Sequence, residues 1–299
     1  RWRNGNGSWR ANRGSVLALM MHINMWLAFF DTGNAQTYYS EVARLAEVDS
    51  WIDGTYYSLQ SMEQMSNVFR GNSNEGLFEI VQNITMGEVF DTNNMWCTKV
   101  VYEVRNKTEA DFAYSEAFLT HLYPEETNDM RKEYWFKNLY REEGTGGSSS
   151  IRPVEIIKLL NADEYKSTTI PNAGNYIVFR LADVILLYAE ALNNLGEREK
   201  ALQEVNRIRQ RAGAPDFTME DDLDASIYWE RVRELMGEGQ YYYDLVRTMK
   251  ITDASFAVFS DDSGHRETMA NLKQGSWTWP IYKGALDNNP YMSKNIYWE

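Results

Sequence analysis

Cysteine is nearly absent from this sequence. Cys97 is the single cysteine among 299 residues, which excludes a disulfide within the chain and a cysteine-based zinc site. His22, His121 and His265 are far apart, and none has a second His or Cys at ligand spacing. Residues 261–264 (DDSG) lack the repeated acids of a calcium loop and are interpreted as a solvated loop. We therefore expect neither a resident metal nor a cofactor.

Basic residues are too few to dominate the surface. The chain has 30 Lys and Arg against 43 Asp and Glu, a net charge of −13. Binding of a nucleic-acid backbone or an anionic lipid surface needs clustered positive charge. The basic and tryptophan-rich start, residues 1–13, leads directly into an apolar helix and does not change this balance. Nucleic acid is therefore not an expected partner.

A long uninterrupted hydrophobic run is also missing. The most apolar stretch, residues 16–30, is interrupted by His22 and Asn24. It is shorter than the roughly 18 residues that a membrane-spanning helix needs. Because it is apolar nearly all round, we expect a deeply buried core helix. The chain starts at Arg1 without a charged-then-apolar leader, so we expect that its start has been trimmed.

Signature motifs of catalysis are absent as well. There is no G-x-S-x-G elbow, no G-x-x-x-x-G-K-[ST] loop and no G-x-G-x-x-G turn. Paired carboxylates remain, since glycoside hydrolysis needs two acids about 5 to 10 Å apart. Glu75, Glu79, Glu88 and Asp91 lie in or near an aromatic, turn-rich region. Spacing alone selects no pair among them, so we expect no catalytic residue and no enzyme.

What the sequence does contain is pairs of helices. Residues 180–213 show helical spacing of apolar residues on both sides of Gly196, with Ala189 and Ala201 small enough for close antiparallel packing. Residues 10–48 repeat this pattern around Gly33. Two such hairpins resemble tetratricopeptide units. We predict a third pair over residues 228–249, in which Tyr242 is the tyrosine of the Tyr241–Tyr243 run that faces the core.

The third pair carries a dense cluster of charges. Glu230, Arg231, Glu234, Asp244 and Arg247 fall within 18 residues. Arg231 and Glu234 are i,i+3 neighbours on a helix, and an acid in a first turn favours the helix dipole. These roles favour scaffold over catalysis.

The same residues carry a family resemblance. The stretch ERVRELMGEGQYYYDLVR, residues 230–247, resembles the signature of the SusD/RagB family, outer-membrane nutrient-binding lipoproteins of Bacteroidetes. Further stretches similar to family motifs follow in the family's order: Arg10, Arg13 and the helix start after them; residues 53–59 and 74–80; residues 123–131; residues 179–196; and residues 279–295. Tyr282, Ala285 and Leu286 depart locally from the closing motif.

The resemblance implies an all-α dominated fold of tetratricopeptide-like helix pairs with long irregular loops. Residues 1–299 would form a single SusD/RagB-like domain that lacks its N-terminal portion. It implies a surface-exposed, non-enzymatic protein of the outer membrane that binds a nutrient and docks on a SusC-like TonB-dependent transporter. The ligand would be an oligosaccharide or, in some members, a peptide; a glycan-cleaving enzyme is the less favoured alternative. The lipid anchor implied by the family is absent from this chain.

Ligand-binding residues are expected just after the strand that ends at Ile80, where ligand loops of the family tend to lie. Aromatic faces suit the C–H side of a sugar and polar side chains suit its hydroxyls. The candidates in this segment are Phe90, Asp91, Asn93, Asn94, Trp96 and Tyr102. A buried Trp96 beside Cys97 is the alternative, because tryptophan is highly buried on average.

Overall fold

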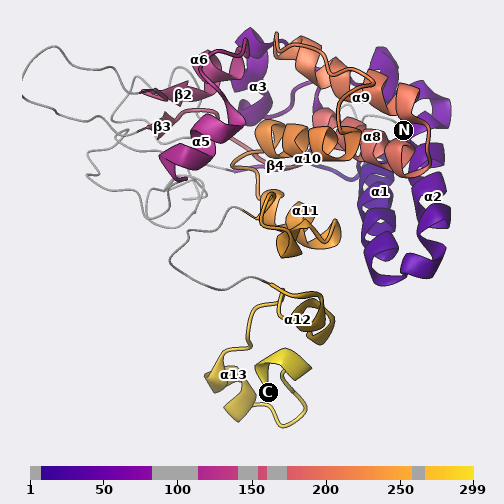
Figure 1. The fold of residues 1–299 in the computed structure, drawn as a ribbon, viewed down its shortest axis with the longest axis vertical. Helices are drawn as coiled ribbons and strands as arrows, with labels where there is room; N and C mark the ends of the chain where they lie inside the picture. The colour runs from indigo at the N-terminus through magenta and orange to yellow at the C-terminus, as the bar shows by residue number, and fades with distance from the viewer. Residues whose placement is uncertain (1–7, 83–113, 141–153, 160–173, 258–266) are drawn as a thin grey trace, which may run out of the picture. The chain divides into compact units, whose positions relative to one another are not determined.

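The structure is a computed structural model that describes residues 8–82, 114–140, 154–159, 174–257 and 267–299. The chain divides into two compact units, Arg1–Tyr241 and Tyr242–Glu299, each of which is described by itself. Helices dominate both units (Figure 1). In the first unit they are α1 (Arg13–Phe30), α2 (Ala35–Glu47), α3 (Met65–Arg70), α5 (Glu116–Leu122), α6 (Arg131–Trp135), α8 (Leu181–Asn194), α9 (Arg198–Arg211) and α10 (Leu223–Glu234).

Helices α8 and α9 form the predicted hairpin. Gly196 turns the chain with a φ of 83°, a conformation that favours glycine. Ala189 and Ala201 are both fully buried, so the two helices can pack closely. The sequence prediction of this pair is confirmed.

Helix α1 begins at a capping box. The Asn12 side chain accepts from the Ser15 backbone N–H at 2.9 Å, and the Ser15 hydroxyl accepts from the Asn12 N–H at 2.8 Å. Asn12 also joins this helix start to other segments, because its Nδ2 donates to the Leu77 carbonyl and its Oδ1 accepts from the Tyr57 hydroxyl. The helix then runs 18 residues and turns into α2, which completes the second predicted hairpin.

The prediction that the first helix is buried nearly all round is wrong. Helix α1 packs one face, which includes Ala18, Met21 and Met25, against α2 and α8. Its other face leaves large side chains such as Ile23 47% exposed. Among the described residues, α1 is the helix whose length and composition would suffice to cross a membrane, with 39% of it buried. Buried helices of other proteins pass the same criterion, and α1 packs one of its faces on α2 and α8.

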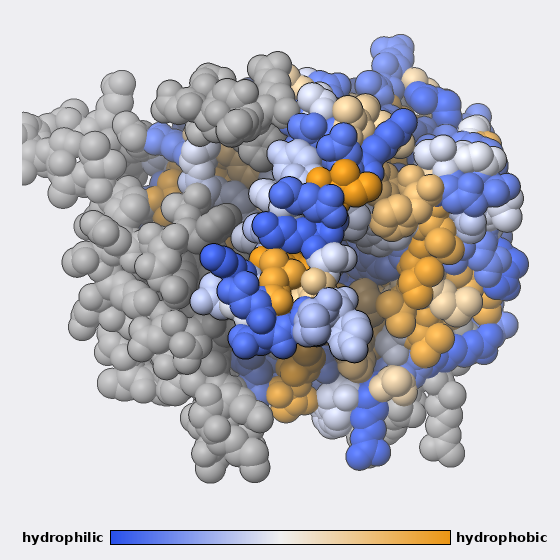
Figure 2. All heavy atoms as spheres, turned by 90° about the horizontal axis from the view of Figure 1, so that it is seen from below, coloured by the Kyte–Doolittle hydropathy of each residue, from blue (hydrophilic) through white to orange (hydrophobic). Residues whose placement is uncertain are grey.

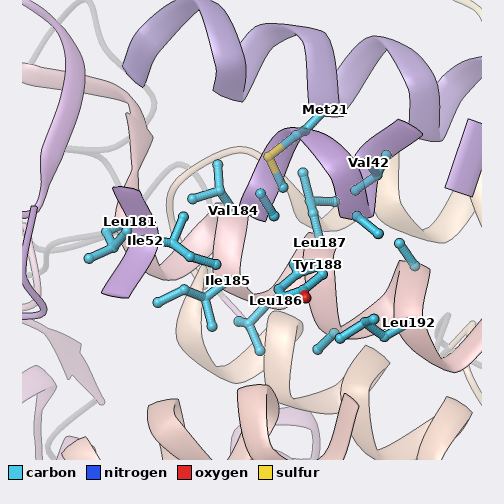
Figure 3. Close-up of a cluster of buried hydrophobic side chains, with 14 of the residues drawn as sticks. Met21, Val42, Ile52, Leu181, Val184, Ile185, Leu186, Leu187, Tyr188 and Leu192 are labelled. Atoms are coloured by element: carbon cyan, nitrogen blue, oxygen red, sulfur yellow. The ribbon is translucent and has the colours of Figure 1, made fainter. Parts of the chain in front are cut away.

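Helix α8 lies at the centre of the first unit. It contacts α1, α2, α9 and α10, and eleven of its fourteen residues are buried. Figure 3 shows Val184 and Leu187 pointing to the side of Met21, while Ile185 and Leu186 point away from it. The interior helix of the first unit is therefore α8 rather than α1.

Short strands accompany the helices. Strand β1 (Gly76–Ile80) pairs antiparallel with β4 (Tyr176–Arg180), and Ile80 lies opposite Tyr176. Strand β2 (Phe136–Lys137) pairs antiparallel with β3 (Glu155–Ile156). Because Arg180 ends β4 and Leu181 begins α8, the β1–β4 ladder connects directly to the central helix.

The second unit contains short helices: α11 (Tyr241–Arg247, whose first residue belongs to the first unit), α12 (Met269–Gln274) and α13 (Lys283–Asp287). Leu245 and Val246 are buried, but Tyr242 is 38% exposed. The prediction that Tyr242 faces the core is therefore wrong. The Tyr242 hydroxyl instead donates to the carbonyl of Trp277 at 2.7 Å, which leaves its ring partly in solvent.

Candidate functional site: a buried ion-pair network

Glu234, at the end of α10, is the centre of a buried ionic network. Its carboxylate accepts from Arg180 Nη1 at 2.7 Å, from Arg131 Nη1 at 3.2 Å, and from Arg211 Nη2. None of the four side chains is more than 5% exposed. The three arginines come from β4, α6 and α9, so one carboxylate ties three elements to α10.

Glu230, one turn earlier on α10, repeats this arrangement. It accepts from Arg209 Nη1 at 2.8 Å and from Arg233 Nε at 3.0 Å, and its other oxygen lies 2.8 Å from Arg131 Nη1. Asp129 holds Arg131 from the opposite side, with oxygens 2.7 and 2.9 Å from Nη2 and Nε. The i,i+4 spacing of the two glutamates places both on one helix face, where Arg131 bridges them.

Glu238, in the turn after α10, extends the network to Lys158, which lies just beyond the end of β3. Arg180 binds its carboxylate through two nitrogens, each at 2.7 Å. Lys158 Nζ lies 2.5 Å from the same carboxylate, donates to the carbonyls of Glu234 and Met236, and sits 4.3 Å from the ring centre of Trp135. Such charge-assisted bonds fix the geometry of the turn.

Arg231 faces away from this network and binds α8. Its two terminal nitrogens donate to the Asp183 carbonyl and to Asp183 Oδ1, both at 2.9 Å. His22 of α1 lies 2.6 Å from the other Asp183 oxygen. Helices α1, α8 and α10 are thereby linked through one buried carboxylate.

The acids of the network are held ionised. Burial alone would raise the pKa of Glu230, but Arg131, Arg233 and Arg209 hold it at about 2. Burial is likewise outweighed at Glu234, whose pKa is lowered mainly by Arg211 and Arg180. Burial lowers the pKa of Lys158 to about 8, against the opposing effect of Glu238. A carboxylate that stays ionised and fully paired is a poor general acid.

The geometry also argues against the predicted carboxylate candidates as catalysts. Glu75 is fully buried and binds Arg180 at 2.8 Å, and Glu79, 1% exposed, accepts from Ser8 at 2.6 Å and from Asn175 at 2.8 Å. Both acids hold the scaffold. Glu88 and Asp91 lie outside the described residues.

A small cleft beside the network is too limited for a sugar. It is lined by Ile177, Val178, Arg180, Asp183, Leu235, Glu238 and Gln240, and measures about 200 Å³ including the part open to solvent. Ligand pockets are usually about 300 to 1,000 Å³. Among the described residues, no group of three or more His, Cys, Asp or Glu side chains is placed to hold a metal ion.

The remaining residues singled out in the sequence lie apart from the network. Arg10 is exposed, and Arg13 forms an ion pair of 2.7 Å with Asp49 in which both side chains are about half exposed. Such surface pairs contribute little. In the second unit, Asp244 and Arg247 are buried and bind each other at 2.6 and 2.9 Å.

The predicted ligand residues cannot be placed. Phe90, Asp91, Asn93, Asn94, Trp96 and Tyr102 all lie outside the described residues. The structure does describe where their segment starts. Ile80 and Val81 are about half exposed at the end of β1, and Ile80 is opposite Tyr176. The chain therefore leaves β1 and enters β4 at the same end of the ladder, which the Glu79 and Asn175 side chains bind together.

Most cations of the network were not among the residues predicted from the sequence. Arg131 and Arg180, like the acid Glu75, lie within stretches that carry the family resemblance, and that resemblance was the one indication of their importance. Lys158, Arg209 and Arg211 give no comparable signal, because nothing in their local pattern points to partners on distant elements.

We expect the network to make the first unit sensitive to acid. The pKa values of Glu230, Glu234, Glu238 and Asp183 are all lower in the folded chain than their ordinary values. Their contribution is therefore complete above the unfolded values, about 4 to 4.5, and is lost as the pH falls towards 2. Melting temperatures followed by circular dichroism from pH 7 to pH 2.5 should fall steeply below about pH 4.5.

A Glu230→Gln variant is the control for this pH dependence. It should start from a lower melting temperature at pH 7 and lose less on acidification, because one titrating group is gone. If the melting temperature of the variant fell with pH as much as that of the unaltered chain, Glu230 would not contribute to the acid sensitivity.

Comparison with known proteins places this scaffold in a family. A sequence model of the SusD family matches residues 27–298. The chain is 43% identical to a solved SusD homolog from Bacteroides thetaiotaomicron, with a TM-score of 0.86 over 100% of this chain and 63% of that one. It is 35% identical over 133 residues to SusD-like protein P38 of Formosa agariphila, covering 41% of this chain and 24% of that protein.

These matches define a protein with the helix-dominated SusD fold, and the chain belongs to the SusD family. A further solved structure, surface glycan-binding protein A from Bacteroides thetaiotaomicron, is 16% identical with a TM-score of 0.66 and shares the fold. The chain spans less than two thirds of the length of these relatives.

Proposed function

We propose that this chain is part of a cell-surface nutrient-binding protein that holds an oligosaccharide and delivers it to a SusC-like TonB-dependent transporter. The observation that carries the proposal is its membership of the SusD family over residues 27–298. The name of the glycan-binding protein that shares its fold supports a sugar as ligand. Function resides in the site rather than in the fold, so the ligand has to be tested on this chain.

Binding without catalysis agrees with the chemistry of the described residues. Their clustered acids are buried and paired with arginines, as at Glu230 and Glu234. A glycoside hydrolase commonly needs one carboxyl group that is protonated and a second carboxylate that faces the substrate or its attacking water. The decisive experiment is calorimetric titration with a panel of oligosaccharides and peptides, followed by product analysis after long incubation. Saturable sugar binding with no product supports the proposal; sugar cleavage, or binding of peptides alone, refutes it.

The binding surface is proposed to include Phe90, Asp91, Asn93, Asn94, Trp96 and Tyr102. Their segment follows directly after β1 in the sequence, and Ile80 and Val81 at this strand end are about half exposed. The β1–β4 ladder is held by the Glu79 carboxylate, which accepts from Ser8 at 2.6 Å and from Asn175 at 2.8 Å. A rigid strand end that supports a polar and aromatic segment is a suitable base for a binding loop.

Trp96→Ala tests this surface. If Trp96 stacks on the ligand, the variant should lose about 1 to 3 kcal/mol of binding free energy, by analogy with base–aromatic stacking, and keep its melting temperature. Trp279→Ala is the matched control, because Trp279 is 88% exposed and lies in the other unit. A loss of about 3 to 5 kcal/mol in stability with unchanged affinity would identify Trp96 as a core residue instead.

The transporter partner and the lipid anchor are proposed from the family resemblance. Pull-down of the complete protein from detergent-solubilised outer membranes should recover a large barrel protein. Recovery as a free periplasmic monomer would contradict both features. Sugar binding by the isolated chain would remain unaffected, so the two parts of the proposal are tested separately.

A further inference from the structure

The outer side of α10 carries one large aromatic side chain among polar ones. Ser226, Trp229 and Arg233 follow one another at intervals of three and four residues, and all three are partly exposed. The described surface in Figure 2 is largely hydrophilic, with hydrophobic residues gathered in separate patches. Contact between an aromatic ring and water is unfavourable, so a tryptophan on a polar strip needs a physical reason.

The Trp229 ring is held between two other rings. The ring of Tyr228 lies 5.1 Å from it at an interplanar angle of 73°, and the ring of His121 lies 4.9 Å from it at 75°. Tyr228 is buried in the core, whereas His121 is exposed near the end of α5, which contacts α10 (Figure 1). Such edge-to-face contacts favour one ring orientation. A side chain whose orientation is set beforehand loses less conformational entropy when it binds a ligand.

Polar groups that could bind hydroxyls lie next to this ring. Arg233 is one helical turn beyond Trp229, and its partly exposed guanidinium is oriented by a bond from Nε to Glu230 at 3.0 Å. The imidazole of His121 can both donate and accept hydrogen bonds. The Tyr123 hydroxyl donates to the Arg233 carbonyl at 2.8 Å, which attaches the segment after α5 to the end of α10.

The segment after α5 has a fixed conformation and adds acidic groups. Lys132 Nζ donates to the carbonyls of Pro124 and Glu125, both at 2.9 Å, and to the carbonyl of Thr127. One ammonium group therefore holds three carbonyls of this turn together. The side chains of Glu125 and Glu126 remain exposed, so the turn presents carboxylates to solvent.

A sugar ring is the ligand that suits this arrangement. A pyranose has C–H groups on its faces and hydroxyls around its edge, and sites that combine an aromatic wall with a few placed polar groups match both. A nucleic acid would also stack on an aromatic ring, but its phosphates need clustered cations, and here Glu125 and Glu126 are exposed. A partner helix needs a row of large apolar residues, whereas the neighbours of Trp229 on the strip are Ser226 and Arg233.

We propose that Trp229 stacks on one pyranose unit of an oligosaccharide, while His121 and Arg233 bind hydroxyls at the edge of the same unit. Trp229 is then a sugar-contacting residue in addition to the candidates between Phe90 and Tyr102. This role rests on the proposed function of the chain in oligosaccharide binding.

Calorimetric titration of the complete protein tests this role. The probe is the member of a panel of cello-, xylo-, manno- and malto-oligosaccharides that the unaltered protein binds most tightly. Trp229→Ala should raise its Kd by about 5- to 100-fold, by analogy with base–aromatic stacking, and Trp229→Tyr, which keeps a ring, should raise it much less. Trp279→Ala is the matched control, because Trp279 is 88% exposed in the other unit, and it should leave Kd unchanged.

Modification of His121 provides a second measurement that needs no variant. Its exposed imidazole should react with diethyl pyrocarbonate, and a saturating concentration of the probe sugar should slow this reaction severalfold, as followed by mass spectrometry. An unchanged Kd in folded Trp229→Ala would overturn the role of Trp229 and leave the proposed function intact. Unprotected His121 would do the same if that variant did not fold. If the unaltered protein bound no sugar at all, the proposed function and the role of Trp229 would both fail.

Discussion

Glu234→Gln is expected to lower the free energy of unfolding of the first unit by about 3 to 5 kcal/mol. The substitution keeps the shape of the side chain but removes its charge. Arg180, Arg131 and Arg211 would then remain buried with fewer carboxylates to balance them. Urea unfolding followed by circular dichroism measures the change.

An exposed ion pair on α2 provides the matched control. Arg44 binds Glu41 at 2.6 and 2.7 Å, but its side chain is 60% exposed. Glu41→Gln should therefore change stability by no more than about 1 kcal/mol. Equal effects of Glu41→Gln and Glu234→Gln would show that burial adds nothing to the ionic network.

Leu187→Ala is the second change with a large expected effect. Leu187 is fully buried in α8 and points towards the α1 side of the core (Figure 3). Removing most of its side chain should destabilise the chain by about 2 to 5 kcal/mol, because transfer free energy is lost and a cavity remains. Thermal and urea unfolding of the 299-residue chain provide the measurement.

Leu19→Ala is the control of the same residue type, since Leu19 is 48% exposed on α1. In the 299-residue chain it should change stability by about 0.5 kcal/mol or less. A small effect of Leu187→Ala would contradict the central position of α8.

The local pattern of the sequence determined the helix pairs. The apolar spacing on both sides of Gly196 and the small residues Ala189 and Ala201 specify a close antiparallel hairpin without reference to the rest of the chain. The ordered motifs from residue 10 to residue 295 likewise identified the family. These features are readable because each depends on neighbours within a few helical turns.

The tertiary structure alone decided which charges meet. Arg180 and Glu75 are 105 residues apart in sequence, and Arg131 and Glu234 are 103 apart, yet both pairs are buried and in contact. The charge pattern of α10 allowed surface pairs such as Arg231 with Glu234 equally well. Burial against β4, α6 and α9 selects the long-range partners, because an unpaired buried charge is far more costly than an unpaired charge in water.

The tertiary structure also decided which faces of the apolar helices are covered. By composition, residues 16–30 are the stretch that is expected to be a deeply buried helix. Helix α8 is surrounded by packed elements, whereas α1 is covered on one face and exposes Val16, Ile23 and Leu27 on the other. Periodicity describes how apolar side chains are distributed around a helix, but the elements that cover them come from distant parts of the chain.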